Sequence, residues 1–341
     1  MTGPSHTPLL EVRSLCKHFP IQKGFLKKTI GNVRAVDDVS FFVEEGETLG
    51  LVGESGCGKT TTSRCVVRAI APTSGQMLFR TGDGQVVDLA RLDRAALRPL
   101  RPEMQMIFQD PYSSLNPRMN LLDIVGEPLL VNGMANRKQR TDQVAELLQL
   151  VGMRPEYMQR FPHAFSGGQR QRIGIARALS VHPRLVVADE PVSALDVSVQ
   201  AQILNLLLDL QQRLNLTYIF VAHNLGVVKH ICDRVAVMYV GKLVEMANTG
   251  ELYHRPRHPY TAALMAAVPV ADPRVHSGNV ELKGEVPSPA NPPSGCYFHP
   301  RCAYAEEVCR AQPPGFREIS QGHFVACHRA EEIALPGISL G

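Results

Sequence analysis

The residues from Gly53 to Thr60 read GESGCGKT, which fits the spacing G-x4-G-K-[ST]. The apolar run TLGLV precedes this segment, and apolar residues at helical spacing follow it. Glycines let backbone N–H groups curl around phosphate oxygens, and a helix N-terminus adds a favourable dipole. Lys59 would reach the β- and γ-phosphates, while the Thr60 hydroxyl would hold Mg²⁺. Against the alternative of a flexible glycine turn, we predict an ATP site formed by Gly53, Glu54, Ser55, Gly56, Cys57, Gly58, Lys59, Thr60 and Thr61.

Two carboxylates end the apolar run LVVADE at Asp189 and Glu190. A short β-branched run of this kind is typical of a buried strand, and in an open α/β sheet ligands sit at the carboxyl ends of strands. Asp189 is expected to bind Mg²⁺ through its water shell. Glu190 would polarise the attacking water, a role that contributes about 10²–10⁴-fold to rate. The alternative is a strand that simply ends in solvent.

Two further polar residues follow predicted strands. His223 follows TYIFVA, and Gln109 follows MQMIF. His223 is expected to hydrogen-bond the γ-phosphate and the catalytic carboxylate, although a histidine at a strand end is often an ordinary surface residue. The Gln109 amide can contact Mg²⁺ or water through its oxygen or its nitrogen, which suits a sensor.

Alternating strands and helices must position these residues. Strand patterns at the start, around residues 104–109 and 184–190, and between 217 and 247 alternate with helical ones, which predicts an α/β fold with a mainly parallel sheet. Residues 110–181 are mainly helical, and the polar segment 21–31 is predicted to be a loop. Prolines become frequent after residue 255. We therefore expect a domain over residues 1–255 and an extension over 256–341.

Composition excludes several classes of protein. The chain has 341 residues, 44% of them hydrophobic, and its net charge of +4 is too small to indicate nucleic acid. It contains no run of 18 apolar residues and begins without the apolar stretch of a signal peptide, so a cytoplasmic protein is expected. The four cysteines outside the C-terminal region are expected to be reduced thiols without function; they are Cys16, Cys57, Cys65 and Cys232.

The segment FSGGQRQR, beginning at Phe165, resembles the signature motif of the ATP-binding-cassette (ABC) family. Ser166 suits a helix N-cap, and the two glycines allow an anion to approach exposed N–H groups. The phosphate loop, Gln109, this motif, Asp189-Glu190, the segment SALD and His223 follow one another in the family's order. The resemblance implies a P-loop ABC-type nucleotide-binding domain with a parallel sheet core, a small antiparallel β subdomain and a helical signature subdomain.

The family's mechanism assigns roles to further residues. Two such domains meet head to tail, so the signature residues would grip the γ-phosphate held by the partner; these are Ser166, Gly167, Gly168 and Gln169. Asp196 of the SALD segment would line the shared interface. Phe19 is similar in position to the aromatic that stacks on adenine, with Phe25 in reserve and a buried core phenylalanine as the alternative. Residues 110–117 resemble the groove that receives a helix of the membrane subunit.

The segment RHPYT at residues 257–261 resembles the tail of oligopeptide/dipeptide permease ATPases, a branch that includes nickel and some sugar importers. KHFPIQKGFLKK further resembles the second ATP-binding subunit of dipeptide permeases. The resemblance implies a paralogous ATPase partner, two transmembrane permease subunits and a periplasmic or lipid-anchored binding protein, at the cytoplasmic face of the bacterial inner membrane. A soluble ABC ATPase acting on nucleic acid or ribosomes is the alternative, as is a redox regulator.

Four cysteines crowd into the C-terminal region with the spacing C-x5-C-x6-C-x17-C; they are Cys296, Cys302, Cys309 and Cys327. Clustered cysteines in a cytosolic chain indicate metal ligation more than disulfides. The C-x2-C knuckles typical of zinc sites are missing. Similar peptide-importer ATPases imply a [4Fe–4S] cluster; zinc and unligated thiols remain the alternatives. His299, His323 and His328 lie nearby as candidate outer-shell groups.

Overall fold

The computed structural model describes residues 7–24, 28–267 and 284–338, and the chain divides into two units that are discontinuous in sequence. The first, which we call the signature unit, comprises Met1–Leu10, Val43–Glu47 and Leu78–Val221. The second, the phosphate-loop unit, comprises Glu11–Phe42, Thr48–Met77 and Ala222–Gly341. Some predicted site residues lie in each unit. The phosphate loop and His223 belong to the phosphate-loop unit, whereas Gln109, the signature motif and Asp189-Glu190 belong to the signature unit.

Three parallel strands form the sheet of the signature unit, in the order β8-β7-β6. They are β6 (Met104–Ile107), β7 (Leu185–Asp189) and β8 (Thr217–Ala222). Every residue of β7 and β8 is buried, so these strands read as continuous apolar runs without alternation. The predicted buried strand before Glu190 is confirmed.

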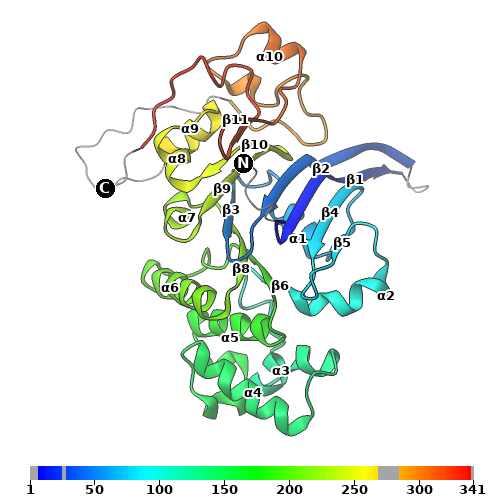
Figure 1. Cartoon of the computed structure of the whole chain (residues 1–341), viewed down its shortest axis with the longest axis vertical. Helices are drawn as coiled ribbons and strands as arrows, with labels where there is room; N and C mark the ends of the chain where they lie inside the picture. The colour runs from blue at the N-terminus through cyan, green and yellow to red at the C-terminus, as the bar shows by residue number, and fades with distance from the viewer. Residues whose placement is uncertain (1–6, 25–27, 268–283, 339–341) are drawn as a thin grey trace, which may run out of the picture. The chain divides into compact units, whose positions relative to one another are not determined.

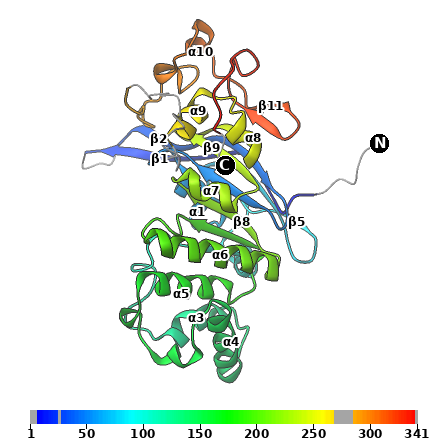
Figure 2. The same cartoon turned by 90° about the vertical axis from the view of Figure 1, so that its left-hand side faces the viewer.

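Four main helices complete this unit, and the segment expected to be helical holds three of them. They are α3 (Leu121–Val131), α4 (Arg137–Leu150), α5 (Gly167–Leu179) and α6 (Val197–Leu214). α3 packs against α4 and α5, and α5 packs against α6 (Figure 2). No helix within the described ranges has the length and apolar character needed to cross a bilayer. The shorter elements are β5 (Val86–Asp88), α2 (Arg94–Leu97), η1 (Arg98–Glu103), η2 (Pro155–Gln159) and η3 (Pro162–Ala164).

One sheet of the phosphate-loop unit has five strands in the order β11-β12-β10-β9-β3. Figure 1 labels β11, β10, β9 and β3 of this sheet. β3 (Thr48–Val52) runs parallel to β9 (Arg234–Tyr239), and the others are antiparallel: β10 (Lys242–Asn248), β11 (Arg317–Ser320) and β12 (His323–Val325). The cysteine-rich extension therefore adds two strands to this sheet. The helices are α1 (Lys59–Val66), α7 (Leu225–Ile231), α8 (Thr249–His254), α9 (Pro259–Ala266), η4 (His299–Arg301) and α10 (Glu307–Ala311).

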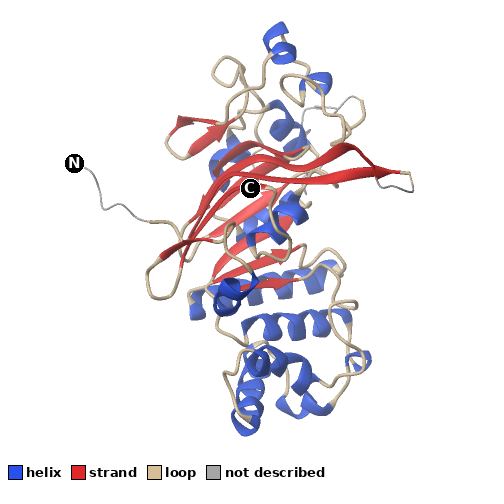
Figure 3. Cartoon of the chain, turned by 90° about the vertical axis from the view of Figure 1, so that its right-hand side faces the viewer, coloured by secondary structure: helices blue, strands red, loops and turns tan. Residues whose placement is uncertain are grey.

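The predicted loop at residues 21–31 is wrong in the described part of that range. β1 (Leu10–Lys23) and β2 (Lys28–Val43) are hydrogen-bonded neighbours that continue into it, and Figure 3 shows them as a long two-stranded ribbon. Most side chains at this end are exposed, including Ile30 at 59%. Because a ribbon satisfies its backbone hydrogen bonds between its strands, it needs no apolar face there. The polar composition of residues 21–31 therefore reflects exposure to solvent, and it does not exclude a strand. β1 and β2 belong to a four-stranded sheet with the order β2-β1-β4-β5. In this sheet the last three residues of β4 (Ser74–Arg80) pair with β5.

A fully buried carboxylate connects β10 to the extension. Glu245 accepts hydrogen bonds from the backbone N–H groups of Arg257 (2.6 Å) and His258 (2.9 Å), and its Oε1 lies 2.7 Å from Nε2 of His323 on β12. A buried charge is tolerated only when its lone pairs are satisfied in this way. Glu245 therefore fixes the HPYT segment and β12 against the same strand.

We expect Glu245→Gln to lower the free energy of unfolding by about 1.5–3 kcal/mol, because an amide replaces the charged acceptor of three hydrogen bonds. Urea unfolding of the full chain, monitored by far-ultraviolet circular dichroism, measures this loss of stability. The exposed Glu285 offers a matched control, and Glu285→Gln should change stability by less than about 0.5 kcal/mol. Equal stability of the two variants would contradict the role of Glu245.

Candidate nucleotide site and cysteine cluster

The phosphate loop connects β3 to α1 in the predicted strand–loop–helix order. Gly53 and Gly58 have φ angles of +149° and +111°. A Cβ at Gly53 would lie 2.2 Å from the carbonyl oxygen of Met238, and one at Gly58 would lie 2.2 Å from that of Ala35. Only glycine fits these positions, so the chain can turn tightly into α1, whose first N–H groups have no carbonyl partner within the helix.

Lys59 is 5% exposed and folds back over this loop. Its Nζ donates to the carbonyl oxygens of Gly53 (2.8 Å) and Glu54 (3.0 Å). An ammonium group held by carbonyl dipoles is placed where a phosphate oxygen can replace one of them as acceptor. Thr60 is the second residue of α1. The loop therefore has the form expected for binding a triphosphate, with Ser55, Gly56, Cys57 and Thr61 also in or beside it.

Glu190 follows β7 with φ = +46°, in the left-handed region that non-glycine residues seldom occupy. Its N–H donates to the carbonyl oxygen of Val221 (3.0 Å), and its own carbonyl accepts from Ser193 through the backbone N–H (3.2 Å) and Oγ (3.1 Å). The SALD segment thus fixes the backbone of Glu190. Strain maintained by three hydrogen bonds is typical of a residue whose side chain must point in one direction.

The carboxylate of Glu190 and the amide of Gln109 are in contact. Gln109 Nε2 donates to Glu190 Oε2 at 3.0 Å, so the sheet edge brings these two predicted residues together. Asp189 ends β7 and is 2% exposed. His223 is exposed in the turn between β8 and α7, within the other unit. Asp196 is the N-cap residue of α6.

The signature motif begins α5 as expected. Ser166 is the N-cap, and a capping box joins it to Gln169: Ser166 Oγ accepts from the N–H of Gln169, and Gln169 Oε1 accepts from the N–H of Ser166. Gly167 and Gly168 form the first turn and are partly exposed. A Cβ at Gly168 would lie 2.5 Å from Val199 Cγ1, so the second glycine lets α5 and α6 approach closely. The helix N-terminus is left open to an anion.

The predicted adenine contact, Phe19, lies on β1 with 37% of its surface exposed. The Nζ of Lys17 lies 4.9 Å from the ring centroid. The ring is thus not buried in the core, which was the alternative for this residue. The reserve candidate, Phe25, lies outside the described residues.

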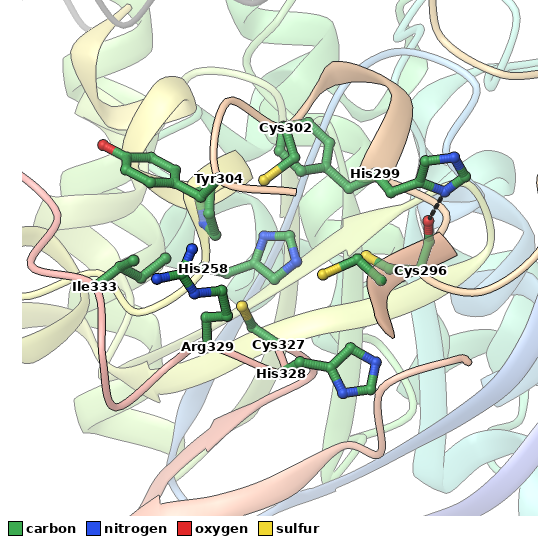
Figure 4. Close-up of a pocket in the computed structure, with 12 residues that line it drawn as sticks. His258, Cys296, His299, Cys302, Tyr304, Cys327, His328, Arg329 and Ile333 are labelled. Carbon is green, nitrogen blue, oxygen red and sulfur yellow. Dashed lines mark hydrogen bonds between the residues drawn. The ribbon is translucent and has the colours of Figure 1, made fainter. Parts of the chain in front are cut away.

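Four cysteines line one pocket of the phosphate-loop unit, and Figure 4 shows the sulfurs of Cys296, Cys302 and Cys327 turned towards a common space beside His258. Cys309 lies on α10 and also lines the pocket. The backbone N–H of Cys296 donates to the carbonyl of Cys309 at 2.8 Å, which holds two of the cysteine-bearing segments together. Residues far apart in sequence therefore present four thiols to one cavity.

Burial sets the charge in this pocket. Burial, together with the charge of the neighbouring cysteines, raises the pKa of Cys296 to about 12 and that of Cys327 to about 11. Burial also lowers the pKa of His258 to about 3, so its ring is neutral and its Nδ1 accepts from the N–H of Tyr260 at 3.1 Å. The pocket would hold several thiolates only with a cationic group among them.

The nearby histidines make different contacts. His299 Nδ1 lies 3.0 Å from the carbonyl oxygen of Cys296, as an outer-shell group would. His328 Nε2 lies 3.0 Å from the carbonyl oxygen of Gln312, and His323 belongs to the Glu245 pair.

The structure adds a grouping that sequence reasoning missed, because its members lie on two neighbouring strands. One potential ligand atom from each of Cys16, His18 and Asp37 lies within 4.8 Å of the other two. Lys242 Nζ lies 3.4 Å from the Asp37 carboxylate, and the N–H of Asp38 donates to Cys16 Sγ. These cationic and donor groups oppose a bound metal ion.

Arg301 and Tyr260 are further site residues that sequence reasoning missed, and both contact the phosphate loop. Arg301 forms a two-point ion pair with Glu54, and the Tyr260 hydroxyl accepts from the Glu54 N–H. Tyr260 belongs to the segment RHPYT, which indicates only a branch of the family, and Arg301 lies beside Cys302 in the cysteine motif. Nothing in the local spacing of either motif indicates a contact with a loop some 200 residues away in sequence.

Comparisons with known proteins agree with this geometry. A family model described as ABC transporter matches residues 36–193, and one described as Oligopeptide/dipeptide transporter, C-terminal region, matches residues 244–309. The chain is 52% identical to the oligopeptide transport ATP-binding protein AppF of Bacillus subtilis, over 96% of this chain and 99% of that protein. It is 48% identical to the di/tripeptide transport ATP-binding protein DppF of Pseudomonas aeruginosa, over 95% and 98%.

A solved structure is also similar. The ATP-binding cassette MJ0796, described as a dimeric post-hydrolysis state bound to ADP and Pi, covers 70% of this chain with 98% of its own length, at a TM-score of 0.61 and 25% identity. The fold class expected from the sequence is thus confirmed for the cassette. Together, the phosphate loop, the Glu190 geometry, the signature helix and these relatives show that the chain belongs to the ABC transporter family, as an ATP-hydrolysing subunit of its oligopeptide/dipeptide branch.

Proposed function

We propose that this chain hydrolyses ATP to drive the uptake of di- and oligopeptides through an ABC importer. The observation that carries the proposal is the identity of 52% with an oligopeptide transport protein over 96% of the chain. The two matched family models span Glu190 and the C-terminal region typical of the branch, while His223 lies between them. Mg²⁺ would be held by Thr60, with Gln109 and Asp189 contributing directly or through water.

The proposed assembly contains a paralogous ATPase subunit, two transmembrane permease subunits and a periplasmic or lipid-anchored binding protein. This chain would lie peripherally at the cytoplasmic face of the bacterial inner membrane. The exposure of residues 110–117 supports a membrane-subunit contact, since Tyr112 is 59% exposed there. From α5, Arg170 lies over the ring of Tyr112, 4.1 Å from its centroid, and Arg177 donates to the carbonyl of Ser114 at 2.7 Å. An exposed aromatic fixed by a helix suits a docking groove.

ATP turnover by the reconstituted transporter tests the peptide assignment. The binding protein loaded with a peptide should stimulate hydrolysis and peptide accumulation in proteoliposomes. Stimulation by a nickel- or sugar-loaded binding protein, with no response to peptides, would assign the same machine to another solute.

We place the cassette at residues 1–255 and the branch-specific extension at 256–341.

For the four cysteines we propose a [4Fe–4S] cluster. A single tetrahedral zinc with Zn–S bonds of about 2.3 Å would hold its sulfurs about 3.8 Å apart. Within the described ranges, no three of the four sulfurs lie within 4.8 Å of one another. The spacing therefore favours a larger group, and four cysteines are the usual ligands of an iron–sulfur cluster. The group would supply the positive charge that these buried thiolates require.

Anaerobically purified chain is expected to contain about four iron and four acid-labile sulfide per molecule. Cys302→Ser should lose most of this iron, because it removes one ligand. Cys16→Ser is the matched control and should retain it, since Cys16 lies outside the pocket. Stoichiometric zinc without iron in the unaltered chain would contradict the cluster.

A further inference from the structure

The turn between Cys296 and Cys302 contacts the phosphate loop. Arg301 Nη1 lies 2.8 Å from Glu54 Oε2, and Nη2 lies 3.2 Å from Oε1, so the pair is bidentate. The Arg301 side chain is 5% exposed, whereas that of Glu54 is 26% exposed. A planar guanidinium that is largely buried loses little entropy in such a pair, so this contact is stronger than a typical surface ion pair.

The backbone of Glu54 is held from the same region. Its N–H donates to the hydroxyl of Tyr260 at 2.9 Å, and Tyr260 is fully buried on α9. Phe298, also in the cysteine-bearing turn, packs against the rings of Tyr260 (centroids 5.5 Å apart) and Tyr239 (5.3 Å). The turn therefore fixes Glu54 twice, directly through Arg301 and indirectly through the aromatic group that supports Tyr260.

Another residue of the turn reaches the strands that carry the predicted adenine contact. The hydroxyl of Tyr297 donates to Asp37 Oδ2 on β2 at 2.8 Å. The other carboxylate oxygen of Asp37 lies 3.6 Å from Nε2 of His18, the residue before Phe19 on β1. The turn thus contacts both the phosphate loop and the β1–β2 ribbon.

The position and charge of Glu54 bear directly on the bound nucleotide. Lys59 Nζ is held by the carbonyl of Glu54 at 3.0 Å, so a shift of Glu54 moves the ammonium that must meet the phosphates. In addition, the Glu54 carboxylate belongs to a loop that binds a polyanion. Without Arg301, the negative charge of Glu54 would repel the triphosphate. Because Glu54 is partly buried, solvent would screen this repulsion only weakly.

We propose that Arg301 is a positioning residue for ATP, which neutralises Glu54 and fixes the phosphate loop to the cysteine-bearing turn. The order of that turn, and with it the presence of the group that the cysteines hold, thereby sets the affinity for nucleotide. The inference deepens the proposed function and rests on it, because it assumes ATP at the phosphate loop.

Equilibrium binding of a non-hydrolysable ATP analogue with Mg²⁺ to the full chain, purified anaerobically, tests this role. Arg301→Gln should weaken binding about tenfold, within the range of coupling between sites in proteins. In the assembled transporter the same change should raise KM for ATP with little change in kcat. Arg317→Gln is the matched control: it breaks a surface pair with Glu331 in the same extension and should leave binding unchanged.

Two further variants separate a specific role from a merely disordered turn. The double variant Arg301→Gln/Glu54→Gln should regain most of the lost affinity, because the uncompensated carboxylate is gone; a disordered turn would not be rescued in this way. Cys302→Ser should weaken binding to a similar degree, and adding Arg301→Gln to it should weaken binding little further.

Unchanged affinity in Arg301→Gln, or a double variant that binds as weakly as Arg301→Gln, would overturn the inference while leaving the transport assignment intact. No binding of nucleotide by the unaltered chain would overturn the proposed function and this inference with it.

Discussion

Replacing Glu190 by glutamine is expected to lower the rate of ATP hydrolysis by about 10²–10⁴-fold while leaving binding of MgATP intact. The amide keeps the size of the side chain and can still contact Gln109, but it cannot accept a proton from the attacking water. The backbone of Glu190 is fixed by Val221 and Ser193, so the substitution should not disturb the strand end. Steady-state turnover and nucleotide binding, measured on the same preparation, separate the two effects.

Glu146 provides the control for this change, because it is exposed on α4. Glu146→Gln should hydrolyse ATP at the unaltered rate. If Glu190→Gln also retained full turnover, Glu190 would have no part in activating water, and another carboxylate at the sheet edge would have to take its place.

A negative charge at the start of the signature helix is expected to reduce ATP hydrolysis nearly as much as Glu190→Gln does. The affected site is the one whose phosphate loop belongs to the partner subunit. Gly167→Asp should reduce hydrolysis at the site completed by this helix by about 10²–10³-fold, the cost of losing preorganised donors to a reacting anion. A Cβ at Gly167 meets only Leu195 Cδ2, at 3.4 Å, and Tyr112 Oη, at 3.8 Å, so the side chain fits. Aspartate in the first turn also suits the helix dipole, so folding should be preserved.

The matched control lies on the same helix. A Cβ at Gly174 meets nothing within 4 Å, so Gly174→Asp adds the same charge in open space away from the N-terminus. It should support hydrolysis at close to the unaltered rate. Both variants should bind ATP normally at their own phosphate loops. A loss of that binding in Gly167→Asp would contradict the assignment of this helix to the partner's nucleotide.

The local geometry of the candidate nucleotide site could be predicted from sequence because each of its motifs is local. The phosphate loop needs glycine at Gly53 and Gly58 for steric reasons, and the apolar run before Asp189 is itself the buried strand. The contact between Gln109 and Glu190 follows from parallel strands whose carboxyl ends share one sheet edge.

Contacts between distant segments could not be predicted in this way. The contact of Glu245 with His323 and the pairing of Arg301 with Glu54 join segments that are 78 and 247 residues apart, and the motifs of these segments do not indicate which partner each contacts. Periodicity also left the orientation of α6 ambiguous. Helical spacing predicts a core stripe on this helix of Val199, Ile203, Leu206, Leu210 and Leu214. Ile203 and Leu210 are buried as predicted, but Leu204 and Leu207 are the other buried residues, and Leu214 is 40% exposed. When leucines lie on several faces of a helix, the elements that pack against it determine which face is buried. The sequence of the helix alone does not specify that face.

We expect ATP to be enclosed between this chain's phosphate loop and the signature helix of a sister subunit. Light scattering of the Glu190→Gln variant, alone and mixed with the proposed paralogous ATPase subunit, measures whether this two-chain state forms. MgATP should produce a species with the mass of two cassettes, and adding Gly167→Asp or Lys59→Ala to the same chain should abolish it. ATP binding without any such two-cassette species, or persistence of that species in the Gly167→Asp background, would contradict a nucleotide site shared between two chains.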